Sequence, residues 1–337
     1  MGMGLFLYAA TAGAVSGAAG ALAIRFFGPG LGLIDTPNER SSHSRATPRG
    51  GGAGIPLGYA AASVFSALPY LSVYPGAAIG LLGLAEDRFT LSTGLRLFLQ
   101  LLICVAALVM LKGVPVGTAS FALFAMWVLF ACGTVNFYNF MDGINGMAGL
   151  IGVISFGALA FYAVTFAGDA TAAAACVFIA FSCMGFLPFN LPRANVFMGD
   201  AGSMFLGFEF AFMVIHLSLS IAEFLCVAMF LSLFYADCLL TLAMRKMEGR
   251  DLMKSHRSHL YQYLCNELGM AHWKVSLVYA SLQAALSMLS IVAYTSGMVW
   301  QISLFAIVSI SALFIYRSVK GLKPHDARHR SEAGVPS

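Results

Sequence analysis

The residues best suited to chemistry gather in one stretch, 136–149, between the apolar runs 116–135 and 150–167. Its polar members recur at every third position: Asn136, Asn139, Asp142 and Asn145. In a helix that continues past the first apolar run, this spacing places the four side chains roughly along one face. Their oxygens, beside a glycine backbone that turns easily, suit Mg²⁺ and a phosphorylated ligand. The plainer interpretation is a polar turn with an asparagine cap, and this stretch alone does not decide between the two.

Two other acidic clusters lie at the ends of apolar runs. Glu86 and Asp87 follow the run 75–85, and adjacent carboxylates at a membrane boundary are costly unless they bind something. A surface salt bridge with Arg88 is the simpler alternative. Asp200 directly precedes another apolar run, where a helix N-terminus favours anions. Asp200 is suited either to cap that helix or to hold a cation that bridges to a bound phosphate.

Two basic loops carry further candidates. In the loop 35–54, Arg49 precedes a run of glycines, and backbone N–H groups at such a helix start can hold a phosphate. The longest hydrophilic loop, 246–273, contains His256, Arg257 and His259. Two histidines are compatible with a metal pair or with ordinary solvated residues, but with Arg257 between them we favour a diphosphate clamp.

The composition indicates an integral membrane protein. The chain has 337 residues, of which 59% are hydrophobic and 10% charged, against about 25% charged residues in soluble domains. Measured against the roughly 20 residues that a helix needs to cross a bilayer, the apolar runs predict about ten or eleven spans. They lie near 3–27, 55–73, 75–85, 95–111, 116–135, 147–167, 170–189, 203–220, 222–244, 274–294 and 299–316. We therefore expect an all-α polytopic bundle, with one domain over 1–320 and a flexible tail over 321–337.

The basic residues predict the orientation. If the N-terminus is outside, eighteen of the nineteen Lys and Arg residues fall on one side and only Lys112 on the other. By the positive-inside rule the basic side is cytoplasmic, so the N-terminus is outside and the C-terminus inside. The first run has no clear cleavage site and is expected to be a retained helix. The seven cysteines show no CxxC spacing, which argues against a disulfide framework or a zinc site.

Two acids lie inside apolar runs. Asp237, Thr241 and Arg245 share one helix face, and Glu209 lies in the preceding run. An acid inside a membrane span is a functional candidate by default. An internal structural pairing explains Asp237 equally well.

Taken together, the motifs resemble those of a known family, the polyprenyl-phosphate N-acetylhexosamine-1-phosphate transferases (WecA/MraY superfamily, glycosyltransferase family 4). The matching segments span residues 35 to about 263, in the order that the family has. They are Thr-Pro-Arg-Gly-Gly from Thr47, Glu-Asp-Arg-Phe from Glu86, Asn-Phe-Tyr-Asn-Phe-Met-Asp-Gly-Ile-Asn-Gly from Asn136, Phe-Met-Gly-Asp-Ala-Gly-Ser from Phe197 and His-Arg-Ser-His from His256.

The resemblance implies transfer of a sugar 1-phosphate from a UDP-N-acetylhexosamine to undecaprenyl phosphate, with Mg²⁺, or Mn²⁺ in its place, as the cofactor. It implies metal ligands at Asn139 and Asp200. The catalytic set that it implies is Glu86, Asp87, Asp142 and His256. It implies substrate contacts at Arg49, Arg96, Asn145, Asn190, Phe197, Arg257 and His259, with Phe197 stacking on uracil and Asn145 near the base. The site would face the cytoplasm from a bacterial inner membrane.

Two points remain open at the level of sequence. The family usually has two aspartates where this chain has Glu86 and Asp87, so the role of the first acid is in question. The spelling of the motifs is closer to the branch that initiates O-antigen or capsule units. The expected partners are the UDP-sugar, undecaprenyl phosphate and membrane lipid, without nucleic acid, and with a homodimer as the alternative to a monomer. A lipid-linked-sugar flippase is the competing function, and it predicts polar groups near the bilayer midplane.

Overall fold

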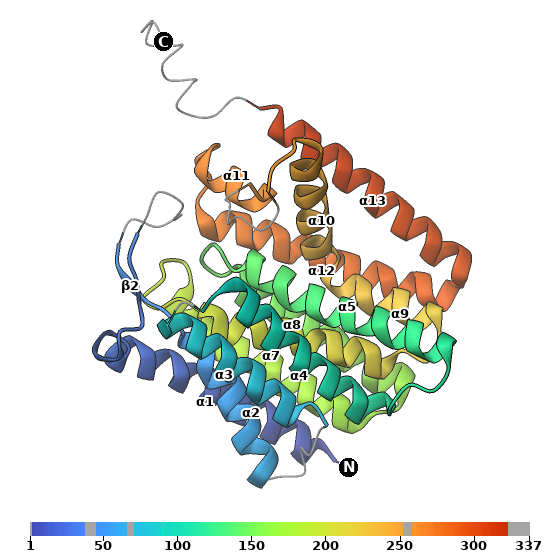
Figure 1. Ribbon diagram of the computed structural model, residues 1–337, viewed down its shortest axis with the longest axis horizontal. Coiled ribbons are helices and arrows are strands. Elements are labelled where there is room, and N and C mark those ends of the chain that lie inside the picture. The colour runs from blue at the N-terminus through green and yellow to red at the C-terminus, as the bar shows by residue number, and fades with distance from the viewer. Residues whose placement is uncertain (1, 38–44, 66–70, 90, 252–257, 323–337) are drawn as a thin grey trace, which may run out of the picture.

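The computed structural model describes residues 2–37, 45–65, 71–89, 91–251 and 258–322, and these are almost entirely helical (Figure 1). The first half of the chain forms α1 Met3–Phe27, η1 Pro29–Leu31, β1 Ile34–Asp35, β2 Thr47–Pro48, η2 Gly51–Ala53, α2 Gly54–Phe65, α3 Val73–Phe89, α4 Thr93–Lys112, α5 Thr118–Met141 and α6 Met147–Tyr162. The second half forms η3 Ala163–Ala167, α7 Ala170–Asn190, α8 Gly199–Leu217, α9 Ile221–Ala228, η4 Met229–Leu231, α10 Ser232–Met247, α11 Leu260–Asn266, α12 His272–Ser296 and α13 Met298–Lys320.

Among the described residues, nine helical segments are long and apolar enough to cross a membrane, with α6 continuing through η3 and α9 continuing through η4 into α10. These nine match nine of the expected spans, so the prediction of an all-α polytopic bundle is confirmed. The other two expected spans correspond to α2 and α3. Both are helical, with 12 and 17 residues in the part of the chain that the structure describes.

The core is built around α8, because this helix is apolar on every side and nearly all of its residues are buried. α3 and α5 pack against it, and α1 packs against α7. Small residues allow the second contact: a Cβ added at Gly13 would lie 2.2 Å from the carbonyl oxygen of Phe178. In contrast, α13 has only two buried residues, Gln301 and Tyr316, and exposes the rest of its apolar surface.

The long helical segment from Ile221 to Met247 is interrupted at η4. One side chain from α12, Gln283, hydrogen-bonds to backbone groups at this interruption. The Gln283 Oε1 accepts a hydrogen bond from Leu233 N at 3.0 Å, and its Nε2 donates to the Met229 carbonyl at 2.9 Å. A backbone group freed inside a membrane must find a partner within the protein. Gln283 supplies both a donor and an acceptor, which allows α10 to change direction at the break.

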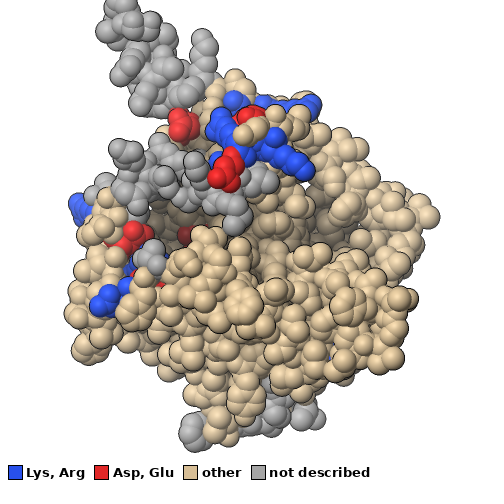
Figure 2. Space-filling view, viewed as in Figure 1, with Lys and Arg blue, Asp and Glu red and all other residues tan. Residues whose placement is uncertain are grey.

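The β1–β2 pair, the ends of α5 and α7 and the start of α8 meet at one end of the bundle, where they surround a pocket. Charged side chains on the visible face gather toward that end and at the ends of α10 and α13, and the rest of this face is uncharged (Figure 2). The fold therefore brings the polar loops together on one side, as the motif pattern predicts.

Candidate active site

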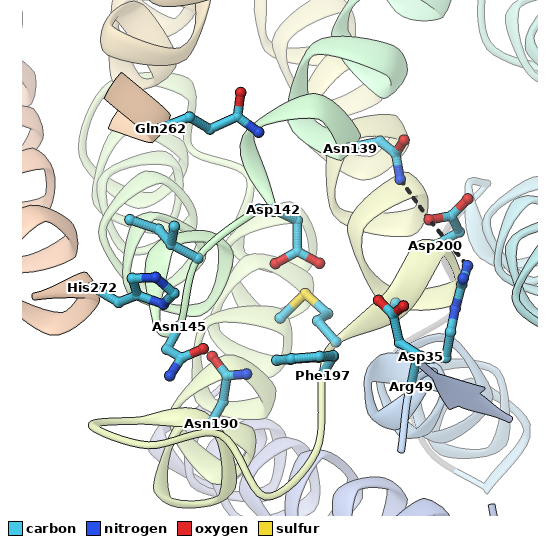
Figure 3. Close-up of a pocket in the computed structure, with 14 residues that line it drawn as sticks. Asp35, Arg49, Asn139, Asp142, Asn145, Asn190, Phe197, Asp200, Gln262 and His272 are labelled. Atoms are coloured by element: carbon cyan, nitrogen blue, oxygen red, sulfur yellow. Dashed lines mark hydrogen bonds and ion pairs between the residues drawn. The ribbon is translucent and has the colours of Figure 1, made fainter. Parts of the chain in front are cut away.

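The pocket at the polar end has a volume of about 280 Å³. Seven of the residues that we expected in a site line it, and Figure 3 shows them around one hollow. They are Arg49, Asn139, Asp142, Asn145, Asn190, Phe197 and Asp200. These residues are as far as 151 positions apart in the chain, and they come from β2, α5, α7 and α8 or the segments next to them.

Asp87 lies directly behind this pocket and caps α8 from α3. Its Oδ1 accepts the Asp200 N–H at 3.0 Å and its Oδ2 accepts the Ala201 N–H at 3.1 Å. These are two of the N–H groups that a helix N-terminus leaves without an internal partner. The cap needs a close approach, because a Cβ at Gly199 would lie 2.5 Å from the Asp87 Oδ2, and the φ of Gly199 is +75°. Since Asp87 does the capping, the Asp200 side chain is left to face the pocket.

The Asp87 carboxylate is also paired with Arg49, whose Nη2 lies 2.7 Å from its Oδ1. The Asp87 side chain has no exposed surface. Burial, and then repulsion by Asp200, raise the pKa of Asp87 to about 6, although Arg49 and the two N–H groups act in the opposite direction. Asp87 thus holds Arg49 and the start of α8 in place, and it does not itself line the pocket.

Glu86 and Arg96 form the neighbouring pair. The Glu86 Oε2 accepts the Leu91 N–H at 2.9 Å, and its Oε1 lies 3.7 Å from the Arg96 Nη1. The extra methylene of Glu, compared with Asp, supplies the reach from α3 to the turn before α4. The buried Nε of Arg96 has no hydrogen-bond partner among the described residues. Arg96 therefore keeps a free donor beside the site.

Asp200 lies between cationic and amide groups. Its Oδ1 accepts a hydrogen bond from the Asn139 Nδ2 at 3.0 Å and lies 4.0 Å from the Arg49 Nη2. Its Oδ2 lies 4.0 Å from the Arg96 Nη1. Asn139 also donates to the Ser203 Oγ at 3.0 Å. The side chains of residues 87, 139 and 200 thus converge, as the proposed site requires.

Asp142 has a different environment, because its carboxylate makes no hydrogen bond or ion pair with the described residues. α5 ends at Met141, so Asp142 is the C-cap residue and projects into the pocket from a turn (Figure 3). Burial raises the pKa of Asp142 well above its ordinary value, with further contributions from the charges of Asp200 and Asp87. A cation or a donor from a ligand would stabilise this carboxylate.

Asn136, on α5 before this turn, does not have the place that we expected. A continuous helical face would carry Asn136 with the other members of the three-residue repeat. Instead, the Asn136 amide donates to Gln100 on α4 at 3.1 Å and to the Cys132 carbonyl at 2.7 Å. Asn136 fastens α5 to α4 and does not line the pocket.

The donor set fits a hard divalent cation. Three carboxylates line the pocket, from Asp35, Asp142 and Asp200, together with the amide of Asn139. Among the described residues, no three His, Cys, Asp or Glu side chains are grouped closely enough to hold a metal by themselves. This pattern suits Mg²⁺, which commonly takes one or two protein carboxylates and completes its shell with water and substrate phosphates.

The segment between α7 and α8 forms the other wall. The Asn190 Oδ1 accepts the Gly146 N–H at 2.6 Å, and its Nδ2 donates to the Val196 carbonyl at 3.0 Å. Asn190 therefore ties this segment to the start of α6. The Asn145 Nδ2 donates to the Pro192 carbonyl at 3.3 Å. These contacts place the Phe197 ring at the edge of the hollow (Figure 3).

Two N–H groups of the glycine run after Arg49 have partners within the protein, which disfavours the phosphate-binding role that we expected for them. The Gly51 N–H donates to the Phe197 carbonyl at 2.9 Å, and the Gly52 N–H donates to the Met198 carbonyl at 2.8 Å. These N–H groups are therefore already used. The glycines permit close packing instead, since a Cβ at Gly52 would lie 2.7 Å from the Cα of Gly202.

His259 also lies away from the place that we expected. Its ring is buried, and its Nδ1 lies 3.3 Å from the Asp237 Oδ1. The same carboxylate accepts the Leu260 N–H, the Tyr261 N–H and the Tyr279 hydroxyl. Asp237 is thus an internal anchor for α11, which is the structural pairing that we kept as an alternative. The predicted catalytic His256 and the substrate-binding Arg257 lie outside the described residues.

Three polar pocket residues were not singled out from the sequence: Asp35, Gln262 and His272. Asp35 belongs to the loop that contains Arg49, but it precedes the basic residues that drew attention. Gln262 follows the His-Arg-Ser-His motif as a half-buried residue of α11, and His272 begins α12. The sequence indicated a role for these three residues only in that each lies in or next to a polar loop on the predicted cytoplasmic side.

Comparison with known proteins finds a family and several relatives to which this chain is similar. Residues 70–218 match the family described as glycosyl transferase family 4. The chain is 26% identical over 312 residues to a probable undecaprenyl-phosphate N-acetylglucosaminyl 1-phosphate transferase of Bacillus subtilis, covering 87% of this chain and 86% of that protein. It is 32% identical over 104 residues to the phospho-N-acetylmuramoyl-pentapeptide-transferase of Staphylococcus aureus, covering 31% of each. With the motifs in the same order, these matches show that the chain is similar to glycosyl transferase family 4 over residues 70–218 and to these two transferases.

Proposed function

We propose that this protein transfers a sugar 1-phosphate of the N-acetylhexosamine type from a UDP-sugar to undecaprenyl phosphate. An oxygen of the lipid phosphate attacks the sugar-bound phosphorus of the UDP-sugar. The bond from that phosphorus to UMP breaks, and undecaprenyl-diphosphate-sugar and UMP are released. The printed names of the B. subtilis and S. aureus relatives support this reaction class. The sugar of the first relative, N-acetylglucosamine, is the first candidate to test.

The observation that carries the proposal is the convergence around Asp200. One carboxylate lies within 4.0 Å of two guanidinium groups, from Arg49 and Arg96, and accepts a hydrogen bond from Asn139. Asp142, without a partner among the described residues, faces the same space. A site that combines acids, amides and arginines in this way is suited to a diphosphate and a divalent cation.

Mg²⁺, or Mn²⁺ in its place, is the cation that we propose, with Asn139, Asp142 and Asp200 as its nearest protein groups. When bound, it would neutralise negative charge on the diphosphate oxygens and favour UMP as the leaving group.

The residues of the chain supply positioning and charge. Arg49 and Arg96 spread negative charge that builds up on the transferred phosphate, and removing one such group typically lowers the rate about 10²- to 10³-fold. Asp87 orients Arg49 and the first turn of α8. Phe197 offers an aromatic face for uracil, and Asn145 offers an amide for the base. Asp35, Gln262 and His272 are further candidates for contacts to the sugar.

The membrane determines how the lipid reaches this site. We propose that the pocket faces the cytoplasm from the inner membrane, so that the lipid tail stays in hydrocarbon and its phosphate reaches the polar end. The two acids within the spans do not favour a flippase. Asp237 is held by the start of α11 and by Tyr279, and Glu209 is buried in the core helix α8.

The test is nucleotide release by the purified full chain in detergent, with undecaprenyl phosphate, Mg²⁺ and a panel of UDP-sugars. UMP should appear with at least one UDP-N-acetylhexosamine and not without the lipid. Asp200→Asn should lower the rate about 10²-fold or more, because the charge at the centre of the site is lost. Asp169→Asn is the matched control, since it makes the same chemical change at the start of α7. If Asp200→Asn is as active as Asp169→Asn, the site is assigned wrongly.

A further inference from the structure

A second pocket lies between the ends of α10 and α13, and it has a different chemistry. It has a volume of about 430 Å³ and shares no lining residue with the candidate active site. Four basic side chains line it, from Arg245, Arg250, Arg317 and Lys320. The single acid that lines it is Glu248, and its Oε2 is already 2.8 Å from the Arg250 Nε. The pocket therefore carries a net positive charge.

The basic groups are held in place from several directions. Arg245 is 6% exposed, and its Nη2 donates to the Asp251 carbonyl. The Lys320 Nζ donates to the Ser258 carbonyl and lies 5.0 Å from the Tyr263 ring centre. These residues come from α10, from the chain on either side of 252–257 and from the last turn of α13. An excess of positive charge on one side of a membrane explains basic residues in loops, but it does not explain their convergence on one concave site.

Arg317 differs from its neighbours. It is exposed at the rim, and it makes no hydrogen bond or ion pair with the described residues. A guanidinium group presents a planar set of donors that matches the oxygens of a phosphate. Arg317 is therefore the group in this pocket that is most available to a ligand.

The exposed apolar surface of α13 beside Arg317 indicates which kind of molecule would bring a phosphate to this pocket. Along α13, Ile307, Ile310 and Phe314 are 60%, 69% and 71% exposed. In a protein that spans a membrane, such a surface lies against lipid chains. Counting back along the helix, Phe314 and Ile310 are three and seven positions before Arg317, so they lie on the same side of it. A lipid whose hydrocarbon chains lie on this surface of α13 would therefore place its phosphate near Arg317.

We propose that this pocket, the α10–α13 basic pocket, binds the phosphate headgroup of an anionic membrane phospholipid whose acyl chains lie along α13. Basic pockets between membrane helices bind such headgroups in other proteins, and each basic residue near an anionic surface contributes about 1 kcal/mol. The proposal concerns a site outside the active site, and it does not depend on the identity of the UDP-sugar. Figure 2 shows the lysine and arginine side chains clustered at this end of the molecule.

Native mass spectrometry of the full chain in detergent tests the proposal, with phosphatidylglycerol and phosphatidylcholine of the same acyl chains as probes. The wild-type protein should bind phosphatidylglycerol more tightly than phosphatidylcholine. Arg317→Gln should lower the affinity for phosphatidylglycerol about fivefold, the equivalent of about 1 kcal/mol. Arg317→Lys should keep most of that affinity, because the charge remains.

Arg25→Gln is the matched control. Arg25 is also an exposed arginine in the last turn of a membrane helix, and it makes no ion pair with the described residues. This variant should bind both lipids as the wild type does. Equal affinity for phosphatidylglycerol in the wild type and Arg317→Gln would overturn the proposal, and so would an equal loss in Arg25→Gln.

A further arm separates a lipid headgroup from free phosphate. Inorganic phosphate in large excess should leave bound phosphatidylglycerol in place, because the acyl chains contribute to binding. If inorganic phosphate displaces the lipid completely, the pocket is a phosphate site and the proposal is wrong. None of these measurements requires turnover, so a failure of the proposed transferase reaction would not be mistaken for a failure of this proposal.

Discussion

Each acid at the polar end has its own environment, and this separates their roles. Glu86 and Asp87 accept hydrogen bonds from the backbone, at Leu91 and at the start of α8. Asp200 accepts from Asn139 and lies near two arginines. Asp142 alone among these four has no such partner among the described residues. The first two acids hold the site together, and the last two are available to a ligand.

Asp142→Asn should have opposite effects on stability and on activity. Asparagine replaces a buried carboxyl whose ionised form Asp200 and Asp87 repel, so the apparent melting temperature of the ligand-free protein should rise by a few degrees, about 1 kcal/mol. It should also lower UMP release by about 10²-fold or more, because a group that faces the cation and the diphosphate is lost. Thermal unfolding without ligand and the activity assay measure the two effects. A variant that loses stability together with activity would contradict this account of Asp142.

Gly199→Ala should disturb the Asp87 cap. The new Cβ would lie 2.5 Å from the Asp87 Oδ2, and the φ of +75° is unfavourable for alanine. We expect a loss of more than about 1 kcal/mol in stability and a strong loss of activity. Gly157→Ala is a suitable control, because nothing lies within 4 Å of its added Cβ and it is inside the helix α6. Comparable melting temperatures for the two variants would show that the close approach has little importance.

Among the helices, α9 and α10 show how a break inside the membrane is stabilised. Gln283 supplies one donor and one acceptor to the freed backbone groups. Gln283→Leu should therefore destabilise the protein by about 1–3 kcal/mol, since both backbone groups lose a buried partner. Gln283→Glu should be close to the wild type when its carboxyl is protonated, because the acid then offers both an acceptor and a donor, and intermediate when it is ionised and keeps only the acceptor. Thermal unfolding of the three proteins in one detergent measures the order, and an unchanged Gln283→Leu would exclude this role.

The sequence was sufficient to predict the helices and the side on which the polar loops meet, because long apolar runs and motif order are local signals. It also predicted that Asn139, Asp142 and Asp200 share a site. It could not show that the Asp87 carboxylate accepts hydrogen bonds from the N–H groups of α8, or that the Asn136 amide donates to Gln100. Those contacts depend on how the helices pack. The burial of His259 against Asp237, while Gln262 on the following helix α11 lines the pocket, likewise depends on how that helix packs.

At the scale of the whole molecule, the orientation across the membrane remains a prediction, and labelling can test it. The seven free cysteines are buried or partly buried, so their background should be low in intact cells. A membrane-impermeant maleimide should label Val116→Cys, which lies between α4 and α5 at an 85% exposed position, from outside. Arg25→Cys, at the other end of the bundle, should react only after the cells are opened. The reverse pattern would invert the predicted topology.

The Asp87 cap has a consequence for how this chain can vary in length. One carboxylate on α3 holds two successive N–H groups of α8, so the two helices are fixed in register to within a single residue. An inserted or deleted residue between the middle of α3 and Asp87 would rotate Asp87 away by about 100°, the turn that each residue of an α-helix adds. Gains and losses of residues in natural variants should therefore be absent from this stretch of α3, whereas connections such as 113–117 and 218–220, which do not bear on the cap, can vary in length.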